Sequence, residues 1–220
     1  MNSPPYWNHN TAYYGWIDRR VSDAGRIVDV GCGDGSLASC LDGGGRTIVG
    51  IDADECCIAR ALAAVDSPNV SFLCAKFEEY RPEEPFDAVI FAASLHHMNM
   101  REALKKAKGI LSPGGRLLIV GLAKPSSIPD HVLELLRVVP SGLLSALRSI
   151  RTAEEAGVPV RYEYPPMNEV RQAVRDLLPG ASIRYGLHYR YLLEWRNRQT
   201  LRTPADASDP RSSCPLPFFT

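Results

Sequence analysis

A glycine-rich segment between two predicted elements is the part of the sequence best suited to chemistry. Residues 28–36 read Val-Asp-Val-Gly-Cys-Gly-Asp-Gly-Ser and lie where an apolar strand gives way to a helix. Glycine lets the backbone pass close beneath a ligand, and a helix N-terminus exposes N–H groups to it. Tight strand-to-helix turns contain glycine whether or not they bind anything, so the turn alone is a weak signal. The next strand ends in Asp52, where a carboxylate can accept both hydroxyl groups of a ribose or, alternatively, cap the following helix.

This turn departs from the dinucleotide pattern. The spacing G-x-G-x-x-G would need glycine at position 36, which is Ser36, and the third glycine is Gly35 instead. Asp29 lies two residues before Gly31, and its carboxylate repels a pyrophosphate but attracts an amine or a sulfonium. The turn therefore favours a cationic cofactor.

Two adjacent histidines, His96 and His97, follow a later strand at the edge where open α/β sheets bind ligands. Either is a candidate general base. The structural alternative is that they cap or pack the next segment. Adjacent imidazoles rarely converge on one ion, so no metal site is predicted.

The elements that must position these residues alternate in type. Short apolar segments predict five strands buried on both faces, at 26–30, 47–51, 70–73, 87–92 and 116–122. Three helices are predicted between these strands. The first begins at Ser36, the second is capped by Asp54, and the third includes the apolar positions from Ala103 to Leu111. This alternation predicts a doubly wound, mostly parallel sheet with helices on both faces.

The pattern changes after residue 122. Asp130 and Ser141 can cap two apolar helices, which either wall an acceptor pocket or only cover the sheet, and another helix starts at Asn168. Residues 181–195 predict two antiparallel strands at the sheet edge, joined near 186–188. The predicted organisation is an aromatic helical segment or lid at 1–25, a domain at 26–196 with a helical insert at about 123–167, and a disordered tail at 197–220.

Composition excludes several classes of function. Lys plus Arg and Asp plus Glu number 25 each, so the net charge is zero and the chain lacks the basic surface that nucleic acids or anionic membranes attract. No secretory signal and no run of 18 apolar residues is found, and the six cysteines form no C-x-x-C pair. We expect a cytoplasmic protein, monomeric or homodimeric, with reduced thiols and neither a nucleic-acid nor a membrane partner.

Four motifs in order carry a family resemblance. They are Asp-Val-Gly-Cys-Gly-Asp-Gly at 29–35, Gly-Ile-Asp at 50–52, Phe-Asp-Ala-Val-Ile at 86–90 followed by Ser-Leu-His-His-Met at 94–98, and Leu-Ser-Pro-Gly-Gly-Arg-Leu at 111–117. This pattern, over about residues 26–122, resembles the class I S-adenosylmethionine-dependent methyltransferases of small molecules, similar to the methyltransferase 11 and 25 domain groups. The resemblance implies a Rossmann-like α/β/α sandwich whose seven-stranded, mostly parallel sheet has an antiparallel last strand. It also implies in-line methyl transfer from S-adenosylmethionine to a small-molecule acceptor, with S-adenosylhomocysteine as product.

The resemblance also assigns site residues. It gives the amino-acid end of the cofactor to Asp29 and to the turn residues Gly31, Cys32 and Gly33. The ribose goes to Asp52 and its neighbour Ala53, the adenine to Phe77, and the methionine portion to Ala92 and Ala93. An N-terminal lid would bring in His9, unless this segment only docks on the sheet.

One position departs from the family pattern. Many relatives have an acid before Phe77 that accepts a hydrogen bond from the adenine amino group, and this chain has Lys76, which cannot accept one. Either Glu78 or Glu79 substitutes, or backbone and packing hold the adenine alone; we expect cofactor binding to be weakened but not abolished. Two alternatives to an active methyltransferase are a non-catalytic protein that binds S-adenosylmethionine or S-adenosylhomocysteine and, less favoured, a nicotinamide-dependent oxidoreductase.

Overall fold

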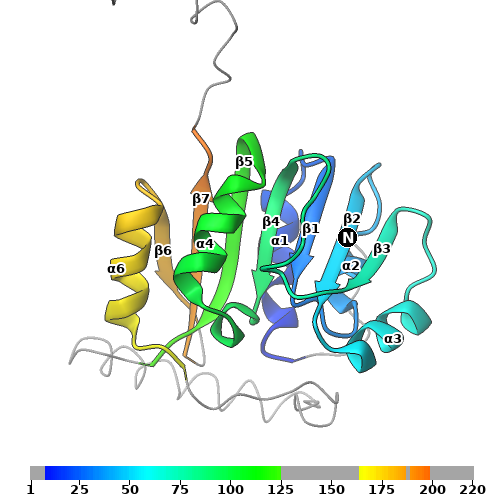
Figure 1. Ribbon diagram of the computed structural model, residues 1–220, viewed down its shortest axis with the longest axis horizontal. Helices are drawn as coiled ribbons and strands as arrows, with labels where there is room; N and C mark the ends of the chain where they lie inside the picture. The colour runs from blue at the N-terminus through cyan, green and yellow to red at the C-terminus, as the bar shows by residue number, and fades with distance from the viewer. Residues whose placement is uncertain (1–7, 125–163, 187–188, 199–220) are drawn as a thin grey trace, which may run out of the picture.

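The computed structural model describes residues 8–124, 164–186 and 189–198. In this part of the chain, one seven-stranded sheet carries helices on both faces (Figure 1). The elements in chain order are η1 (Thr11–Tyr13), α1 (Tyr14–Arg20), β1 (Arg26–Val30), α2 (Ser36–Leu41), β2 (Thr47–Asp52), α3 (Glu55–Ala64), β3 (Val70–Cys74), β4 (Phe86–Ala92), η2 (Leu95–His97), α4 (Met100–Gly109), β5 (Leu111–Leu122), α6 (Met167–Leu177), β6 (Ser182–Tyr185) and β7 (Arg190–Arg196).

The sheet order is β3-β2-β1-β4-β5-β7-β6, and the predicted fold class is confirmed. All neighbouring strands from β3 to β5 are parallel, whereas β7 is antiparallel to both β5 and β6. The reversed strand therefore lies inside the sheet, and β6 forms the edge. The strand order changes direction between β1 and β4, and a switch point of this kind opens a crevice at the carboxyl ends of the strands.

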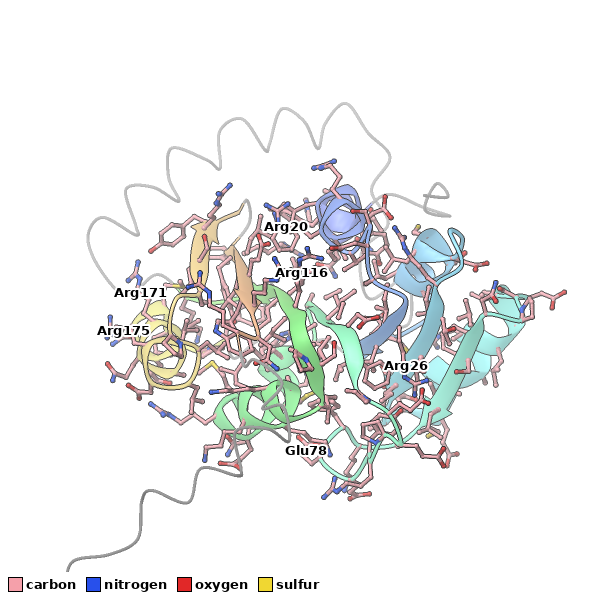
Figure 2. All side chains as sticks on the ribbon, turned by 90° about the horizontal axis from the view of Figure 1, so that it is seen from above. Arg20, Arg26, Glu78, Arg116, Arg171 and Arg175 are labelled. Carbon is pink, nitrogen blue, oxygen red and sulfur yellow. The ribbon has the colours of Figure 1, made fainter. Side chains whose placement is uncertain are left out.

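Two apolar clusters fill the space on the two sides of the sheet. Along β1, Ile27 belongs to the cluster that includes residues of α1 and α2, and the next residue, Val28, to the cluster that includes residues of α4 and α6. Because successive residues point to opposite faces, a strand that is covered on both sides needs an unbroken apolar run. Figure 2 shows α1 and α4 on opposite sides of the sheet, with Arg20 and Arg116 close together; an Arg116 N–H donates to the Arg20 carbonyl at 2.8 Å.

The capping prediction at Asp54 is confirmed. The Asp54 carboxylate accepts hydrogen bonds from the backbone N–H groups of Cys56, at 2.8 Å, and Cys57, at 3.4 Å. These bonds satisfy N–H groups that have no partner within the helix, so α3 begins directly after the sharp end of β2.

The predicted boundary between α4 and β5 is wrong. The sequence pattern extends the helix to Leu111, but this residue is the first of β5 and pairs with Phe86. At its N-terminus the helix has a cap that was not predicted, where the Asn99 side chain accepts from the Glu102 N–H at 3.3 Å. The register with β4 shifts just after Phe86, and residues 112–115 fall within β5 at this irregularity.

The C-terminal elements follow the prediction closely. Helix α6 starts one residue before Asn168, and the antiparallel hairpin of β6 and β7 is confirmed. The two predicted helices near 130 and 141 lie outside the described residues, as do the rest of the insert from 125 to 163 and the tail from 199. Within the described ranges, no helix is both long enough and apolar enough to cross a membrane.

Candidate active site

A cavity of about 530 Å³ opens at the carboxyl edge of the sheet, at the switch point. The turns after β1, β2, β3 and β4 and the N-terminal segment all contribute to its wall. The described lining residues are Asn8, Asn10, Tyr14, Val30, Gly31, Cys32, Gly33, Asp34, Ile51, Asp52, Ala53, Cys57, Ala75, Lys76, Phe77, Glu78, Ala92, Ala93, Ser94, His97, Met98 and Asn99.

The turn after β1 depends on glycine at Gly31. Its φ is +70°, and a Cβ added there would lie 2.3 Å from the Cβ of Ser94. Gly33, with φ of +57°, has no atom within 4 Å of an added Cβ, so its space opens toward the cavity. The first glycine therefore allows two turns to touch, and the second leaves room for a ligand.

The carboxylate of Asp52 supports this turn. One oxygen accepts from the Gly33 N–H at 2.9 Å, and the other accepts from the Asp54 N–H at 3.0 Å. The proposed alternative, in which Asp52 caps α3, is wrong because Asp54 makes the cap. Asp52 and its neighbour Ala53 both line the cavity, where the sequence placed a ribose.

Asp29 lies deeper than the resemblance implied. Its residue is 1% exposed, it pairs with Gly50 and Ile90 across the sheet, and it is not part of the cavity lining. Among the described residues, neither carboxylate oxygen has a hydrogen-bond partner. Burial, together with the charges of Asp52 and Asp34, raises the pKa of Asp29 to about 7. A cation in the cavity would favour the charged form of Asp29 through its electric field rather than by direct contact.

The segment after β3 places the two predicted substitute acids, Glu78 and Glu79, in different surroundings. Lys76, Phe77 and Glu78 line the cavity, whereas Glu79 does not and instead lies 3.8 Å from the Lys76 ammonium. Phe77 is 2% exposed and packs edge-on against Phe91, with ring centroids 5.5 Å apart. Of the two predicted substitutes for the missing acid, only Glu78 is placed to reach a ligand.

The turn after β4 contains a residue with unusual backbone geometry. Ala92 and Ala93 line the cavity as predicted, and Ala93 has a φ of +62°, which is rare without glycine. Its N–H donates to the Val120 carbonyl at 2.7 Å. The hydroxyl of the following Ser94 donates to the Val30 carbonyl, so β1 and β4 are joined under the cavity. The sequence carried no signal for this strained position.

The histidine pair lies on η2, between two cavities. The rings of His96 and His97 are in contact, with centroids 4.0 Å apart and planes tilted by 39°. His97 lines the first cavity, and His96 lines a second one of about 570 Å³. Met98 and Asn99 line both cavities.

The second cavity is enclosed by segments that are distant in sequence. The Tyr164 ring contacts His96 edge-on at 5.2 Å, and Tyr191 reaches the cavity from β7. Tyr191 lies across Gly121, where an added Cβ would be 2.2 Å from its ring. The remaining described lining residues are Leu95, Met98, Asn99, Met100, Arg101, Leu122, Pro165, Glu169 and Gln172. Sequence reasoning missed Tyr164 and Tyr191.

The N-terminal segment, residues 8–13, forms one wall of the first cavity. Asn8 and Asn10 line it, whereas His9 between them is not among its described lining residues. The structure therefore brings this segment to the cavity through its two asparagines, and the predicted lid with His9 at the cofactor stays a prediction.

Comparison with known proteins gives the class to which this arrangement belongs. A family model described as a methyltransferase domain matches residues 27–115. An uncharacterized methyltransferase from Mycobacterium tuberculosis is 33% identical over 200 residues, which cover 89% of this chain and 98% of the relative. A ubiquinone biosynthesis O-methyltransferase from Pseudomonas entomophila is 28% identical over 68% of this chain and 69% of its own length.

Solved structures agree in fold. The N-methyltransferase NodS from Bradyrhizobium japonicum, in complex with S-adenosylhomocysteine, is 16% identical with a TM-score of 0.59 and covers 90% of this chain and 94% of its own. An amino pentose methyltransferase from Micromonospora echinaspora has a TM-score of 0.60 at 15% identity and covers 86% and 92%. The chain belongs to the class I S-adenosylmethionine-dependent methyltransferases. Its cofactor is S-adenosylmethionine, and this family membership disagrees with the nicotinamide alternative.

Proposed function

We propose that the protein methylates a small-molecule acceptor by in-line displacement, with the cofactor in the first cavity, the acceptor in the second, and the reaction at η2. One observation carries this proposal: His96 and His97 are in ring contact, yet each lines a different cavity. Methyl transfer needs two ligands that meet at one point, and positioning them can supply about 7 to 11 kcal/mol of the barrier.

The residues of the first cavity fit S-adenosylmethionine. The open space above Gly33 and the carboxylate of Asp52 suit the amino-acid end and the ribose, and Phe77 and Glu78 lie where the adenine would be held. The strongest support is Asp29, since a buried carboxylate without a hydrogen-bond partner in the described chain is stabilised by a nearby positive charge. The cofactor carries such charges on its ammonium and sulfonium groups.

When bound, the cofactor supplies an electrophilic methyl group whose sulfonium leaves as a neutral thioether. His96 would accept the proton that a hydroxyl or ammonium acceptor loses, which adds roughly 10² to 10⁴ in rate. Tyr164 holds the His96 ring edge-on at 5.2 Å and so fixes the direction of that base. His97, on the cofactor side, would contribute mainly by shaping the boundary.

The second cavity supports a small molecule as acceptor. Its volume of about 570 Å³ is typical of small-molecule sites, and its wall combines apolar Leu95, Met98 and Met100 with aromatic rings. We also expect a reducing, cytoplasmic compartment, in which the five described cysteines, which are free, stay reduced. A monomer or homodimer remains our expectation.

Calorimetry with S-adenosylhomocysteine and with NAD tests the cofactor assignment, and a crystal of the first complex locates the ligand. We expect binding of S-adenosylhomocysteine only, in the cavity above Gly33. A broad acceptor panel with methyl-labelled cofactor then tests turnover. Binding without any turnover would favour the non-catalytic alternative, and a ligand found elsewhere would refute the assignment of the cavities.

A further inference from the structure

We propose that Arg190 is a positioning residue that fastens the N-terminal segment over the cofactor cavity and thereby sets cofactor affinity. The inference rests on the proposed function, because it takes the first cavity as the cofactor site. It concerns a residue from the opposite end of the chain, which does not line either cavity as described.

The contact is a forked hydrogen bond. Arg190 donates to Asn10 Oδ1 from Nε at 3.0 Å and from one terminal nitrogen at 2.7 Å. Asn10 lines the cofactor cavity. Arg190 is the first residue of β7 and pairs with Leu122, the last residue of β5, so the guanidinium starts from the carboxyl edge of the sheet.

Hydrogen bonds within the N-terminal segment hold residues 8–11 together, so that they move as a unit. Asn8 Oδ1 accepts from the N–H groups of Asn10, at 2.8 Å, and Thr11, at 2.9 Å. The Thr11 hydroxyl accepts from the Asn8 N–H at 2.9 Å and donates to the Asn8 carbonyl at 3.0 Å. A bond made at Asn10 therefore positions Asn8 as well, and these are two of the residues that close the cavity.

The surroundings of Arg190 make this bond stronger than a surface contact. Burial lowers the pKa of the guanidinium, while the phenols of Tyr13 and Tyr164 favour its charged form. A charged donor in a buried place forms stronger hydrogen bonds than the same donor in water. Lysine has a single ammonium and cannot reproduce the planar fork.

Arg190 also connects the two cavities. Tyr164, one of its phenol neighbours, lines the second cavity and contacts His96. On the other side Asn10 lines the first cavity, together with His97. The guanidinium therefore bonds to a wall residue of the first cavity and is within electrostatic range of a wall residue of the second.

The fraction of molecules in which the N-terminal segment is in place determines the apparent cofactor affinity. If the N-terminal segment is in place in only a fraction of molecules, the apparent dissociation constant rises by the inverse of that fraction. Loss of the fork should leave the segment in place about one time in ten, which corresponds to about tenfold weaker binding.

A double-mutant cycle measured by calorimetry with S-adenosylhomocysteine tests the inference. We expect Asn10→Ala and Arg190→Met each to weaken binding about tenfold, and the double variant to be no weaker than either alone, since both remove one interaction. Arg190→Lys should recover only part of the loss. The matched control is Arg196→Met at the other end of β7, where the guanidinium bonds to the Gly114 carbonyl and binding should be unchanged.

Limited chymotrypsin digestion at Tyr13 and Tyr14 gives a second readout. S-adenosylhomocysteine should protect these sites in the wild type, and less in Asn10→Ala and Arg190→Met. Variants that lower the melting temperature but bind as the wild type does, or losses that simply add, would overturn the role of Arg190. If Arg190→Met does not fold, the Asn10→Ala measurement decides. A wild type that does not bind S-adenosylhomocysteine would refute the cofactor cavity itself, and this inference with it.

Discussion

The two cavities that meet at η2 are built in different ways. The first cavity, the proposed cofactor site, takes its shape from backbone turns, with positive φ at Gly31 and Gly33 and the Asp52 carboxylate, which accepts a hydrogen bond from a backbone N–H. The second cavity, the proposed acceptor site, is shaped by side chains from segments far apart in sequence, chiefly Tyr164 and Tyr191. Backbone turns constrain the residues next to them and change little without loss of the fold. Side chains on separate elements can be exchanged one at a time, so the shape of the second cavity can change with less disturbance to the fold than that of the first.

Removal of the histidine on the proposed acceptor side should have the largest effect on turnover. We expect His96→Ala to lower kcat by about 10²-fold or more with unchanged affinity for S-adenosylhomocysteine, because the general base is lost and the cofactor cavity is not. His97→Ala is the matched variant and should act mainly on that affinity. Steady-state kinetics, with an acceptor identified in the panel, measures kcat for both variants, and calorimetry measures their affinity for S-adenosylhomocysteine. Losses below about threefold in both variants would refute base catalysis and leave positioning alone.

The buried carboxylate of the cofactor side predicts a dependence on pH. Because the pKa of Asp29 is raised from 3.8 to about 7, the folded protein holds this proton more tightly than the unfolded chain does, and stability falls as the pH rises between those values. Asp29→Asn should therefore stabilise the ligand-free protein by up to about 4 kcal/mol at pH 8, and hardly at all below pH 4.

Denaturant unfolding at several pH values measures this effect. Binding of S-adenosylmethionine should change in the opposite sense: the wild-type affinity rises as the pH passes 7, and Asp29→Asn binds more weakly without that rise. A variant that is no more stable at pH 8 would contradict the assignment of a charged, buried carboxylate.

A glycine on the acceptor side gives a smaller effect confined to the second cavity. In Gly121→Ala the new Cβ meets the Tyr191 ring, so the ring must move, at a cost of about 1 to 3 kcal/mol in stability. We expect acceptor turnover to fall while the affinity for S-adenosylhomocysteine stays the same. Tyr191→Phe, which keeps the ring and removes the hydroxyl, separates packing from hydrogen bonding. Equal loss of cofactor binding would show that the cavities are not independent.

The smallest expected effect concerns the adenine. Glu78→Ala should weaken S-adenosylhomocysteine binding about fivefold, or about 1 kcal/mol, through the loss of one hydrogen bond. Glu79→Ala is the matched control, since this acid lies beside Lys76 and not in the cavity lining. An analogue with inosine in place of adenosine should bind both variants alike. A larger effect of Glu79→Ala would show that Glu79, and not Glu78, holds the adenine.

The sequence predicts the cavity built from backbone turns better than the cavity built from side chains of distant segments. The turn at Gly31, the carboxylate at Asp52 and the cap at Asp54 were predictable because each depends on neighbours within a few residues. Tyr191 was not, since its position depends on the missing side chain of Gly121, which only strand pairing brings beside it.

Asp29 shows a limit of a different kind. The sequence places Asp29 at the end of β1, two residues before Gly31, but its depth depends on the register with Gly50 and Ile90 in two other strands. A residue pattern along one strand does not contain that information. The roles of the predicted helices near 130 and 141 lie outside the described residues, and the assignment of an acceptor to the second cavity stays a prediction.

Reversal of β7 has a consequence for how the molecule is made. Since this strand runs against its neighbours, its beginning rather than its end reaches the carboxyl edge of the sheet, and Asn10 meets its partner only after residue 190 has been synthesised. The glycine turn needs only strands β1 to β5, whereas the contact that holds Asn10 waits for the hairpin of β6 and β7. Under the proposed function, the wall above the nucleoside is therefore completed later in synthesis than the turn beneath it.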